Sequence, residues 1–555
     1  MAKTIIIGGA AGGATAATRL RRLDENMEII LLEKGDYISY ANCGMPYYIG
    51  GIIQDDRELT VMTPSKLSSQ FNIDIRIKNE AIAIDRKGKL ISIQNHNSGE
   101  IYQENYDYLI LATGAAPIIP TGIKDFEGVF SLRDIPDTIK IKSFIDNNKP
   151  NSAVVIGGGA IGLEMAENLI QANISTSIIE LSDHIGGPLD FDMASFLHKY
   201  LRETGVNLIL NNSVNEIVHN KKKILLKLND RTVETDMVIV SIGVRPVSKL
   251  AVESGLEINQ KGAVIVNNRM QTIDSDIYAI GDLVEIRDYI TGDKTYMPLA
   301  GPAQKQARIA ADNIIGKISE YHGTSSCGIV KVFDKTVAFC GLNEKTLKAK
   351  NIDYQKIYTY LPSHPSYYPD SGFMTIKLMF DKKSGKILGA QIIGTMGVDK
   401  RADVLATAIR LNGTVKDLTE LELPYSPPYS SAKDPVNIAG LTAQNVVENI
   451  SDVFHYEDLK NIDLANSELL DVRTRFEFEK GHIDGFKNIP LNELRQRVNE
   501  LNKEKTVYVT CFVGQRGYLA ERILKGHGFK ALNLSGGYRL YKSIYDEKTI
   551  LDIKK

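Results

Sequence analysis

The sequence predicts an α/β protein of several domains, because one β-α-β pattern occurs twice in a long chain. In its first copy the apolar run at residues 4–7 ends in a glycine-rich turn at 8–13, and a helical pattern continues from Ala14 to Leu23. The second copy has the same order from Ala153 onward. A chain of 555 residues exceeds one core, and about 150 residues per domain suggest three or four domains. The fold class is therefore mixed α/β with more than one core.

The two glycine-rich turns predict two dinucleotide-binding sites. Glycines let the backbone approach a pyrophosphate at a helix N-terminus, and an acidic residue at the end of the next strand can accept a hydrogen bond from a ribose. The residues in these roles are Gly8, Gly12, Gly13 and Glu33 in the first copy and Gly157, Gly159, Gly162 and Glu180 in the second. Ala10 replaces the middle glycine of the first turn. Glu180 is expected to repel the 2′-phosphate of NADP, which favours NADH while leaving NADPH possible.

Composition and charge exclude several classes of protein. With 66 Lys and Arg against 68 Asp and Glu, the net charge is −2, so neither nucleic acid nor an anionic membrane is expected as a partner. The N-terminal apolar run is too short for a signal peptide, and no later run approaches the roughly 18 apolar residues of a membrane helix. Four cysteines without short paired spacing predict neither a disulfide framework nor a metal site. A cytoplasmic location is expected.

Two further segments extend the pattern: the apolar stretch from Tyr108 to Gly114 and the segment from Thr272 to Asp282. With them, residues 1–445 resemble the pyridine nucleotide-disulfide oxidoreductase family of flavoprotein reductases. The resemblance implies four additional FAD contacts, Thr113, Gly114, Gly281 and Asp282. It implies an FAD-binding domain split between 1–118 and 246–322, an NAD(P)H-binding domain at 119–245 and an α+β dimerisation domain at 323–445. It also implies a homodimer whose subunits share their active sites.

Cys43 has no second cysteine nearby, since Tyr48 stands five residues further on. Family members that use an internal disulfide have two cysteines at about this spacing. The resemblance therefore implies that Cys43 exchanges sulfur with a substrate or takes a second oxidation state. Pro46 is tolerated in the first turn of a helix, which places Cys43 at a helix start. The helix dipole is expected to lower the pKa of the Cys43 thiol from about 8.5 and to favour the thiolate.

Three single-cysteine chemistries compete for this site. NADH peroxidases and oxidases cycle their cysteine through a sulfenic acid and have a histidine just before the glycine pair of the first turn, where this chain has Ala11. The stretch from Ser39 through Asn42 to Cys43 instead resembles coenzyme A-disulfide reductases and NADH-dependent persulfide or polysulfide reductases. A redox-sensing flavoprotein with slow turnover is a further alternative.

This second resemblance implies coenzyme A as a ligand. The residues implied to bind it are Thr15, Arg19, Arg22, Ser39 and Asn42. Arg19 and Arg22 lie three positions apart on one face of the first helix, where they would hold the ADP phosphates of the coenzyme. A solvated basic face is the alternative interpretation.

Two tyrosines are candidates for the acid that protonates the departing thiolate. Tyr367 and Tyr425 lie in segments that resemble the tyrosine segments contributed by the partner subunit in coenzyme A-disulfide reductases. A phenol can donate a proton to a thiolate without being charged at neutral pH. Tyr368 and Tyr429 are near neighbours, and either assignment could slip by one register. Plain packing of the tyrosines in an interface loop is the alternative.

A further domain is predicted at residues 458–555, after a linker at 446–457. The segment from Leu469 to Arg473 and the strand that ends at Cys511 resemble a single α/β rhodanese domain. In such a domain Cys511 would accept sulfane sulfur, and the amides of the loop that follows would hold the persulfide anion. Arg516 would add a fixed positive charge. A phosphatase-like loop is the alternative for this motif alone, but the loop is one residue shorter than is typical of phosphatases.

Asp471 and Arg473 are expected to brace this domain rather than to react. Taken together, the sequence predicts a homodimeric FAD enzyme that passes electrons from NADH, or from NADPH, to coenzyme A disulfide, coenzyme A persulfide or polysulfide. Electrons would pass through Cys43, and the sulfurtransferase would lie on the same chain.

Overall fold

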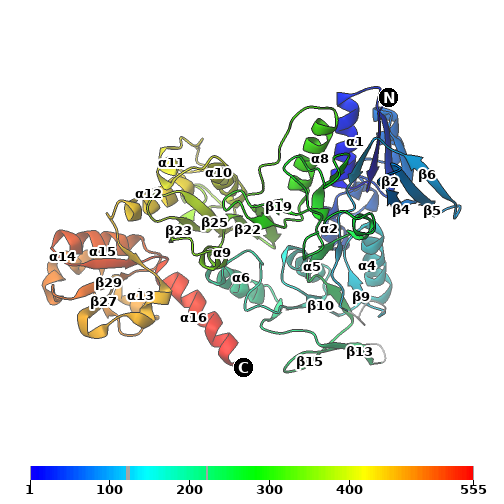
Figure 1. The fold of residues 1–555 in the computed structure, drawn as a ribbon. Helices are drawn as coiled ribbons and strands as arrows, with labels where there is room; N and C mark the ends of the chain where they lie inside the picture. The colour runs from blue at the N-terminus through cyan, green and yellow to red at the C-terminus, as the bar shows by residue number, and fades with distance from the viewer. Residues whose placement is uncertain (1, 121–125, 221–222, 554–555) are drawn as a thin grey trace. The chain divides into compact units, whose positions relative to one another are not determined.

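A computed structural model describes residues 2–120, 126–220 and 223–553, which form two compact units (Figure 1). One unit contains Met1–Leu181 and Gly205–Thr324, and the other contains Ser182–Thr204 and Ser325–Lys555. Residues 1, 121–125, 221–222 and 554–555, which belong to the predicted domains, lie outside the described residues.

The first glycine-rich turn belongs to a five-stranded parallel sheet in the order β18-β7-β1-β2-β3. Its strands are β1 (Lys3–Ile7), β2 (Glu28–Glu33), β3 (Asp74–Ile77), β7 (Tyr108–Leu111) and β18 (Ile277–Ala279). Parallel strands are covered on both faces, which explains their nearly continuous apolar sequences. The helices α1 (Ala11–Leu23) and α8 (Ala300–Ile314) pack side by side (Figure 1). A separate antiparallel sheet contains β4 (Asn79–Asp85), β5 (Leu90–Asn95) and β6 (Ile101–Asn105).

The second glycine-rich turn belongs to another five-stranded parallel sheet, in the order β12-β11-β10-β16-β9. Its strands are β9 (Val129–Ser131), β10 (Ser152–Ile156), β11 (Ser175–Ile179), β12 (Asn207–Ile209) and β16 (Met237–Val240). Two helices, α4 (Ile135–Asn148) and α5 (Ala160–Gln171), accompany it. The helix α6 (Phe191–Glu203), although it lies within the predicted NAD(P)H-binding range, is grouped with the second compact unit.

Shorter elements complete the first unit. Its remaining helices are α2 (Met45–Ile49), α3 (Pro64–Phe71) and α7 (Lys249–Glu253). Its remaining strands are β8 (Ala115–Pro117), β13 (Glu216–Asn220), β14 (Lys223–Lys227), β15 (Thr232–Thr235), β17 (Val244–Pro246), β19 (Ile286–Arg287) and β20 (Lys294–Thr295).

The second unit contains a five-stranded antiparallel sheet in the order β21-β22-β25-β24-β23. Its strands are β21 (Gly328–Val332), β22 (Lys335–Gly341), β23 (Tyr354–Pro362), β24 (Phe373–Asp381) and β25 (Ile387–Gly394). The helices of this region are α9 (Glu344–Ala349), α10 (Val398–Arg410), α11 (Val415–Glu420) and α12 (Pro435–Val447). Antiparallel strands followed by amphipathic helices confirm the predicted α+β domain.

The C-terminal region of the second unit contains a parallel sheet in the order β26-β30-β29-β27-β28. Its strands are β26 (Val453–Phe454), β27 (Ser467–Asp471), β28 (Lys487–Asn488), β29 (Thr506–Thr510) and β30 (Ala531–Leu534). Its helices are α13 (Arg475–Glu479), α14 (Leu491–Arg497), α15 (Gln515–Gly526) and α16 (Gly537–Ile553).

Within the second unit, α16 packs against α6. Ser543 forms a hydrogen bond of 2.9 Å with Ser195. Arg539 lies between two rings, with its guanidinium carbon 4.2 Å from the ring centre of Phe196 and 4.0 Å from that of Tyr360. Stacked arginines of this kind stabilise an interface through both packing and cation-π attraction. The C-terminal domain is therefore firmly attached to α6 and to the antiparallel sheet.

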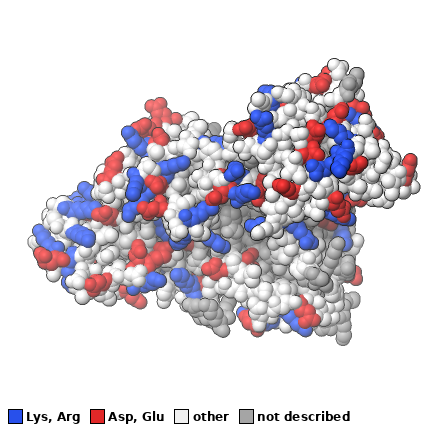
Figure 2. All heavy atoms as spheres, viewed as in Figure 1, with Lys and Arg blue, Asp and Glu red and all other residues white. Residues whose placement is uncertain are grey.

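Surface charge agrees with the balanced composition. On the face shown in Figure 2, basic and acidic side chains are interspersed rather than gathered into one large field of a single sign. Among the helices that the structure describes, none is both long enough and apolar enough to span a bilayer.

Candidate active sites

In the first glycine-rich turn, which connects β1 to α1, the backbone atoms of the turn and of the helix start lie close together. Gly8 has a φ of +104°, and a Cβ on Gly13 would lie 1.8 Å from the Gly8 carbonyl oxygen, so a side chain at position 13 would block the helix start. Ala10, the N-cap of α1, provides no side-chain cap. The first amides of α1 therefore remain available to a phosphate.

The second turn repeats this construction. Gly157 has a φ of +105°, and a Cβ on Gly162 would lie 2.0 Å from the Gly157 carbonyl oxygen. The N-cap of α5 is Gly159, which likewise provides no side-chain cap. Two uncapped helix N-termini behind close glycine turns fit the two dinucleotides that the sequence predicts.

The two predicted ribose carboxylates lie beside these turns. Glu33 accepts hydrogen bonds from the amides of Gly9 (2.9 Å) and Gly35 (2.8 Å). Glu180 accepts one from the amide of Gly158 (2.7 Å). Each carboxylate is thus oriented by its glycine-rich turn, at the position where the sequence predicts a ribose.

The remaining predicted FAD residues lie at the same edge of the first sheet. β18, β7 and β1 are parallel neighbours, so the segments that follow them meet at one end. Thr113 Oγ1 donates to the Val247 carbonyl oxygen (2.7 Å), and Gly114 has a φ of +67°. The amide of Gly281 donates to Gln306 Oε1 (2.7 Å).

The environment of the Asp282 carboxyl group shows whether a flavin cofactor would fit this edge of the sheet. Burial raises the pKa of Asp282 to about 6, because desolvation disfavours its charged form. A cofactor hydroxyl that donated to this carboxylate would stabilise the charged form. The half-buried acceptor, the glycine turn and the uncapped helix together fit FAD.

Cys43 lies on the segment that leaves the first sheet after β2. It is exposed, in the 3-10 turn Asn42–Gly44 that leads directly into α2, and Pro46 occupies the first turn of that helix. The amide of Ser39 donates to the carbonyl oxygen of Gly9 (2.8 Å). The backbone before Cys43 is therefore bonded to the predicted cofactor turn, and the predicted helix start is confirmed.

The predicted depression of the Cys43 pKa is wrong for the protein alone. Burial and the nearby negative charge of Glu164 raise the pKa of Cys43. α2 has only five residues, so its dipole contributes little. Glu164 lies on α5, and the Tyr47 hydroxyl donates to its Oε1 over 3.5 Å. Burial first, and repulsion from Glu167 to a lesser extent, raise the pKa of Glu164 to about 7.

Glu164 was missed by sequence reasoning although it stands only two residues after Gly162. Its carboxyl group is poised to change protonation near neutral pH, within electrostatic range of Cys43. A carboxyl group directly after a second glycine turn was the available signal, but its approach to Cys43 depends on the packing of α2 against α5.

The residues predicted to bind coenzyme A lie around α1 and the Cys43 segment. Thr15, Arg19 and Arg22 follow one another at helical spacing along α1, whereas Ser39 and Asn42 precede Cys43. Arg22 and Asn42 are exposed, and Ser39 is half-buried.

Arg19 already has a partner in the protein. Its Nε donates to Asp312 Oδ1 of α8 (2.9 Å), and Nη2 lies 2.7 Å from the same oxygen. A phosphate at Arg19 would therefore compete with Asp312. Arg21 of the same helix is buried and donates to backbone carbonyls, among them that of Phe71 (2.9 Å).

The segments that carry Tyr367 and Tyr425 are held together by the buried Arg401 of α10. Its Nη2 donates to the Ser363 carbonyl oxygen (2.8 Å) and to Ser430 Oγ (2.9 Å). Tyr367 is 79% exposed and Tyr425 is 62% exposed. Arg401 therefore connects the two segments from the buried side, while the phenol rings of both tyrosines are exposed to solvent.

Cys511 directly follows β29 and begins the loop into α15. Its side chain is fully buried, and the Gly514 amide donates to its Sγ (3.1 Å). Burial raises the pKa of the Cys511 thiol, while the amides of Gly517, Val513 and Gly514 oppose that rise. Inward amides at a helix N-terminus are the predicted anion cradle.

Arg516 and Arg473 have different partners in this domain. Arg516 donates from both terminal nitrogens to Glu477 of α13, over 2.8 Å and 2.6 Å. Sequence reasoning missed this carboxylate. Arg473 pairs with the buried Asp471 over 2.6 Å and lies 4.0 Å from the ring centre of Tyr538. These contacts support the prediction that Asp471 and Arg473 brace the fold, and the absence of a chemical role for them stays a prediction.

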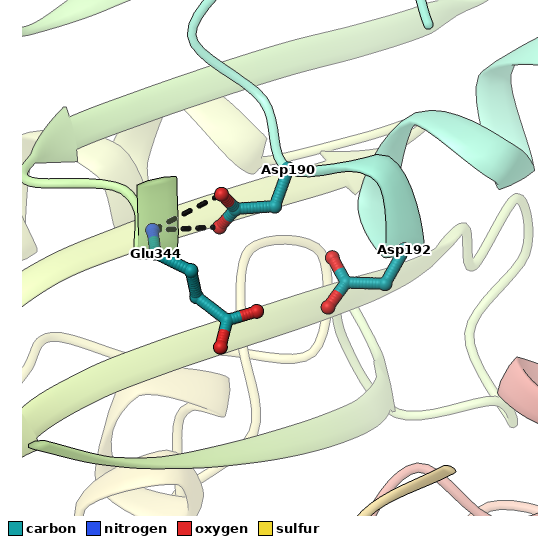
Figure 3. Close-up of side chains that lie close together, drawn as sticks. All are labelled: Asp190, Asp192 and Glu344. Atoms are coloured by element: carbon teal, nitrogen blue, oxygen red, sulfur yellow. Dashed lines mark hydrogen bonds between the residues drawn. The ribbon is translucent and has the colours of Figure 1, made fainter. Parts of the chain in front are cut away.

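A buried acidic cluster lies outside both candidate sites. Figure 3 shows the carboxyl groups of Asp190, Asp192 and Glu344, with the Glu344 amide donating to both oxygens of Asp190 (3.0 Å and 3.2 Å). Such a set could hold a metal ion, but Lys377 Nζ lies 2.8 Å, 2.7 Å and 2.8 Å from these three carboxyl groups. Although burial would lower the pKa of Lys377, the carboxylates outweigh it and raise the pKa. The lysine ammonium therefore supplies the balancing charge.

Comparison with known proteins gives three family matches. Residues 2–307 match the family described as pyridine nucleotide-disulphide oxidoreductase. Residues 328–435 match the dimerisation domain of the same name. Residues 456–544 match the rhodanese-like domain.

Individual relatives extend these matches. The chain is 35% identical over 445 residues to the coenzyme A disulfide reductase of Staphylococcus epidermidis, and the match covers 80% of this chain and 100% of that protein. It is 34% identical over 449 residues, with the same coverage, to a protein named NADH oxidase from Methanocaldococcus jannaschii.

Two solved structures resemble nearly the whole chain. One is the reduced Bacillus anthracis protein named CoADR-RHD, with a TM-score of 0.96, 46% identity and coverage of 98% of each chain. The other is an NAD-dependent persulfide reductase from A. fulgidus, with a TM-score of 0.90, 36% identity and coverage of 97% of this chain and 100% of that one.

Proposed function

Because the chain belongs to the pyridine nucleotide-disulphide oxidoreductase family, we propose that it is an FAD-dependent reductase of sulfur-sulfur bonds. Electrons pass from NADH to coenzyme A disulfide, coenzyme A persulfide or polysulfide. The observation that carries this proposal is Cys43: it is exposed, and its segment is bonded through Ser39 to the cofactor turn at Gly9. No second cysteine stands near it in the sequence, so the sulfur that it exchanges is that of a substrate.

The chemistry at Cys43 follows from its thiolate. The thiolate attacks one sulfur of coenzyme A disulfide, the disulfide bond breaks, and a mixed disulfide forms on Cys43. The departing coenzyme A thiolate takes a proton from Tyr367 or Tyr425. FAD, when bound, supplies the two-electron relay from NADH. Two electrons then return Cys43 to a thiolate and release the second coenzyme A. With coenzyme A persulfide, the same attack releases coenzyme A or hydrosulfide.

We further propose a homodimer in which Tyr367 and Tyr425 serve the Cys43 of the partner subunit. The high exposure of both phenols and the match of residues 328–435 to a dimerisation domain support this arrangement. Plain interface packing of the tyrosines is the alternative.

The proposed coenzyme A site consists of Thr15, Arg19, Arg22, Ser39 and Asn42. Their placement along α1 and before Cys43 supports it. The ion pair between Arg19 and Asp312 opposes it at Arg19, so the exposed Arg22 is the stronger phosphate ligand. For the nucleotide, Glu180 favours NADH over NADPH through its carboxylate.

The domain boundaries predicted above remain part of the proposal, with FAD at 1–118 and 246–322 and NAD(P)H at 119–245. The dimerisation domain at 323–445 is followed by the linker at 446–457. The rhodanese domain at 458–555 is proposed to transfer sulfane sulfur through Cys511, assisted by Arg516. A cytoplasmic location fits the absence of paired cysteine spacing in the sequence.

The test of this function is a steady-state comparison of electron acceptors. NADH oxidation is measured anaerobically with coenzyme A disulfide, coenzyme A persulfide and polysulfide, and separately with oxygen and with peroxide. The proposal predicts that kcat/KM for the best sulfur acceptor exceeds that for oxygen by about a hundredfold or more, since Ala11 stands where the oxidases have a histidine. Faster turnover with oxygen or peroxide would instead assign the chain to the oxidase chemistry named for its Methanocaldococcus relative.

A further inference from the structure

The one cation of the Cys511 loop is already neutralised by a carboxylate. Arg516 Nη1 donates to Glu477 Oε2 (2.8 Å), and Nη2 donates to Glu477 Oε1 (2.6 Å). Two parallel charge-assisted hydrogen bonds fix both the strength and the orientation of such a pair. The side chains of Arg516 and Glu477 are 33% and 31% exposed, whereas Cys511 is fully buried.

Glu477 also accepts hydrogen bonds from its own helix cap, at the oxygen that accepts from Arg516 Nη1. The amide and Oγ1 of Thr474 donate to Glu477 Oε2 over 3.0 Å and 2.9 Å, as part of the capping box at the start of α13. The hydrogen bond from Arg516 is the main cause that lowers the pKa of Glu477 to about 2. The carboxylate is therefore charged at neutral pH and cannot leave Arg516 without losing its helix cap.

This arrangement distinguishes between chemical classes of sulfur donor. Thiosulfate is a dianion, and its approach would place two negative charges beside the carboxylate of Glu477 and the thiolate of Cys511, while Arg516, the cation within residues 511–517, is already paired. A persulfide carried on a thiol presents one terminal sulfur and at most one negative charge. The amides of Val513, Gly514 and Gly517 favour such a single charge on the sulfur and partly offset the cost of its burial.

Apolar side chains beside the pair suit an organic carrier. Phe512 directly follows Cys511 and is 40% exposed, and Leu519, one turn beyond Arg516 on α15, is 47% exposed. Exposed apolar groups gain from covering by an uncharged arm, which a thiol carrier has and thiosulfate lacks.

We propose that Glu477 is a specificity-determining residue of the Cys511 site, which selects sulfane sulfur carried on a thiol over thiosulfate. The proposal rests on the sulfurtransferase part of the proposed function. In the step, the Cys511 thiolate attacks the outer sulfur of the persulfide, and the sulfur-sulfur bond to the carrier breaks. The carrier leaves with the electron pair and takes the persulfide proton, so a Cys511 persulfide forms without any external oxidant or reductant.

The test compares donors in the full-length protein with Glu477→Gln. Glutamine keeps an oxygen that can accept from Thr474 but removes the charge that pairs with Arg516. Cyanide-dependent sulfur transfer is measured with thiosulfate and with coenzyme A persulfide. We expect kcat/KM for thiosulfate to rise about tenfold or more, while that for the persulfide changes less than about threefold. The rate of Cys511 alkylation is also expected to reach half its maximum at a lower pH, because unpaired Arg516 stabilises the thiolate.

Glu479→Gln is the matched control, since it removes the same charge from the same helix at an exposed position. An unchanged donor ratio in Glu477→Gln, or an equal change in Glu479→Gln, overturns the inference. If Glu477→Gln does not fold, the ratio is measured in Glu477→Asp, whose shorter side chain cannot reach both partners; an unchanged ratio there has the same meaning. Failure of the underlying function is distinguishable, because the wild type would then lack Cys511-dependent transfer from every donor.

Discussion

Replacing Cys43 by serine is expected to lower kcat for NADH-dependent reduction of coenzyme A disulfide and coenzyme A persulfide by about a thousandfold or more. A serine hydroxyl forms no disulfide with substrate sulfur, so the sulfur-sulfur bond has no acceptor on the enzyme. Reduction of the bound flavin by NADH should remain near the wild-type rate, because Cys43 belongs to neither glycine-rich turn. Steady-state assays measure the first quantity, and stopped-flow absorbance of the flavin measures the second.

Cys327→Ser is the control for this experiment, because Cys327 precedes β21 in the other compact unit. It should leave both rates within about twofold of wild type. Full turnover in Cys43→Ser would mean that electrons reach the substrate by another route, and the disulfide-reductase proposal would then be wrong.

Replacing Cys511 by alanine is expected to reduce cyanide-dependent sulfur transfer by about a thousandfold or more. The reason is that residues 511–517, which form the loop, contain no other cysteine that could accept the sulfur. Alanine removes a buried sulfur that accepts one hydrogen bond from Gly514, so the domain should stay folded. Reduction of coenzyme A disulfide should stay within about twofold of wild type. Both activities are measured on the same preparation.

The reciprocal variant completes this test. Cys43→Ser should retain the sulfur transfer that Cys511→Ala loses. Loss of both activities in either variant would contradict two separable sites and would mean that Cys43 and Cys511 act as one catalytic unit.

Local chemistry explains what could be predicted from the sequence. Gly13 and Gly162 were identifiable because a strand-to-helix turn of this tightness excludes a Cβ, whatever the rest of the protein does. The pairing of Asp471 with Arg473 was likewise foreseeable, since the two residues are neighbours on one short segment.

Residues brought together by tertiary packing could not be predicted in this way. Glu164 approaches Cys43 from a different helix, and burial of the thiol together with this distant charge reverses the direction expected for the Cys43 pKa. Asp312 and Glu477 pair with Arg19 and Arg516 across long stretches of sequence. An arginine in a sequence motif predicts a positive charge at that position. The carboxylate that pairs with this arginine is known only from the three-dimensional structure.

The buried cluster around Lys377 illustrates the same limit. Its three carboxyl groups come from the segment before α6, from α6 itself and from α9, and the lysine comes from β24. No spacing in the sequence links these positions.

The covalent state of Cys43 tests the central claim most directly. The protein is reduced, freed of reductant without oxygen, and incubated with coenzyme A disulfide; its intact mass and peptide masses are then determined before and after NADH is added. The proposal predicts one coenzyme A bound as a disulfide to the peptide that contains Cys43, and its release by NADH. A Cys43 that gains only oxygen, or a coenzyme A adduct confined to other cysteines, would contradict it.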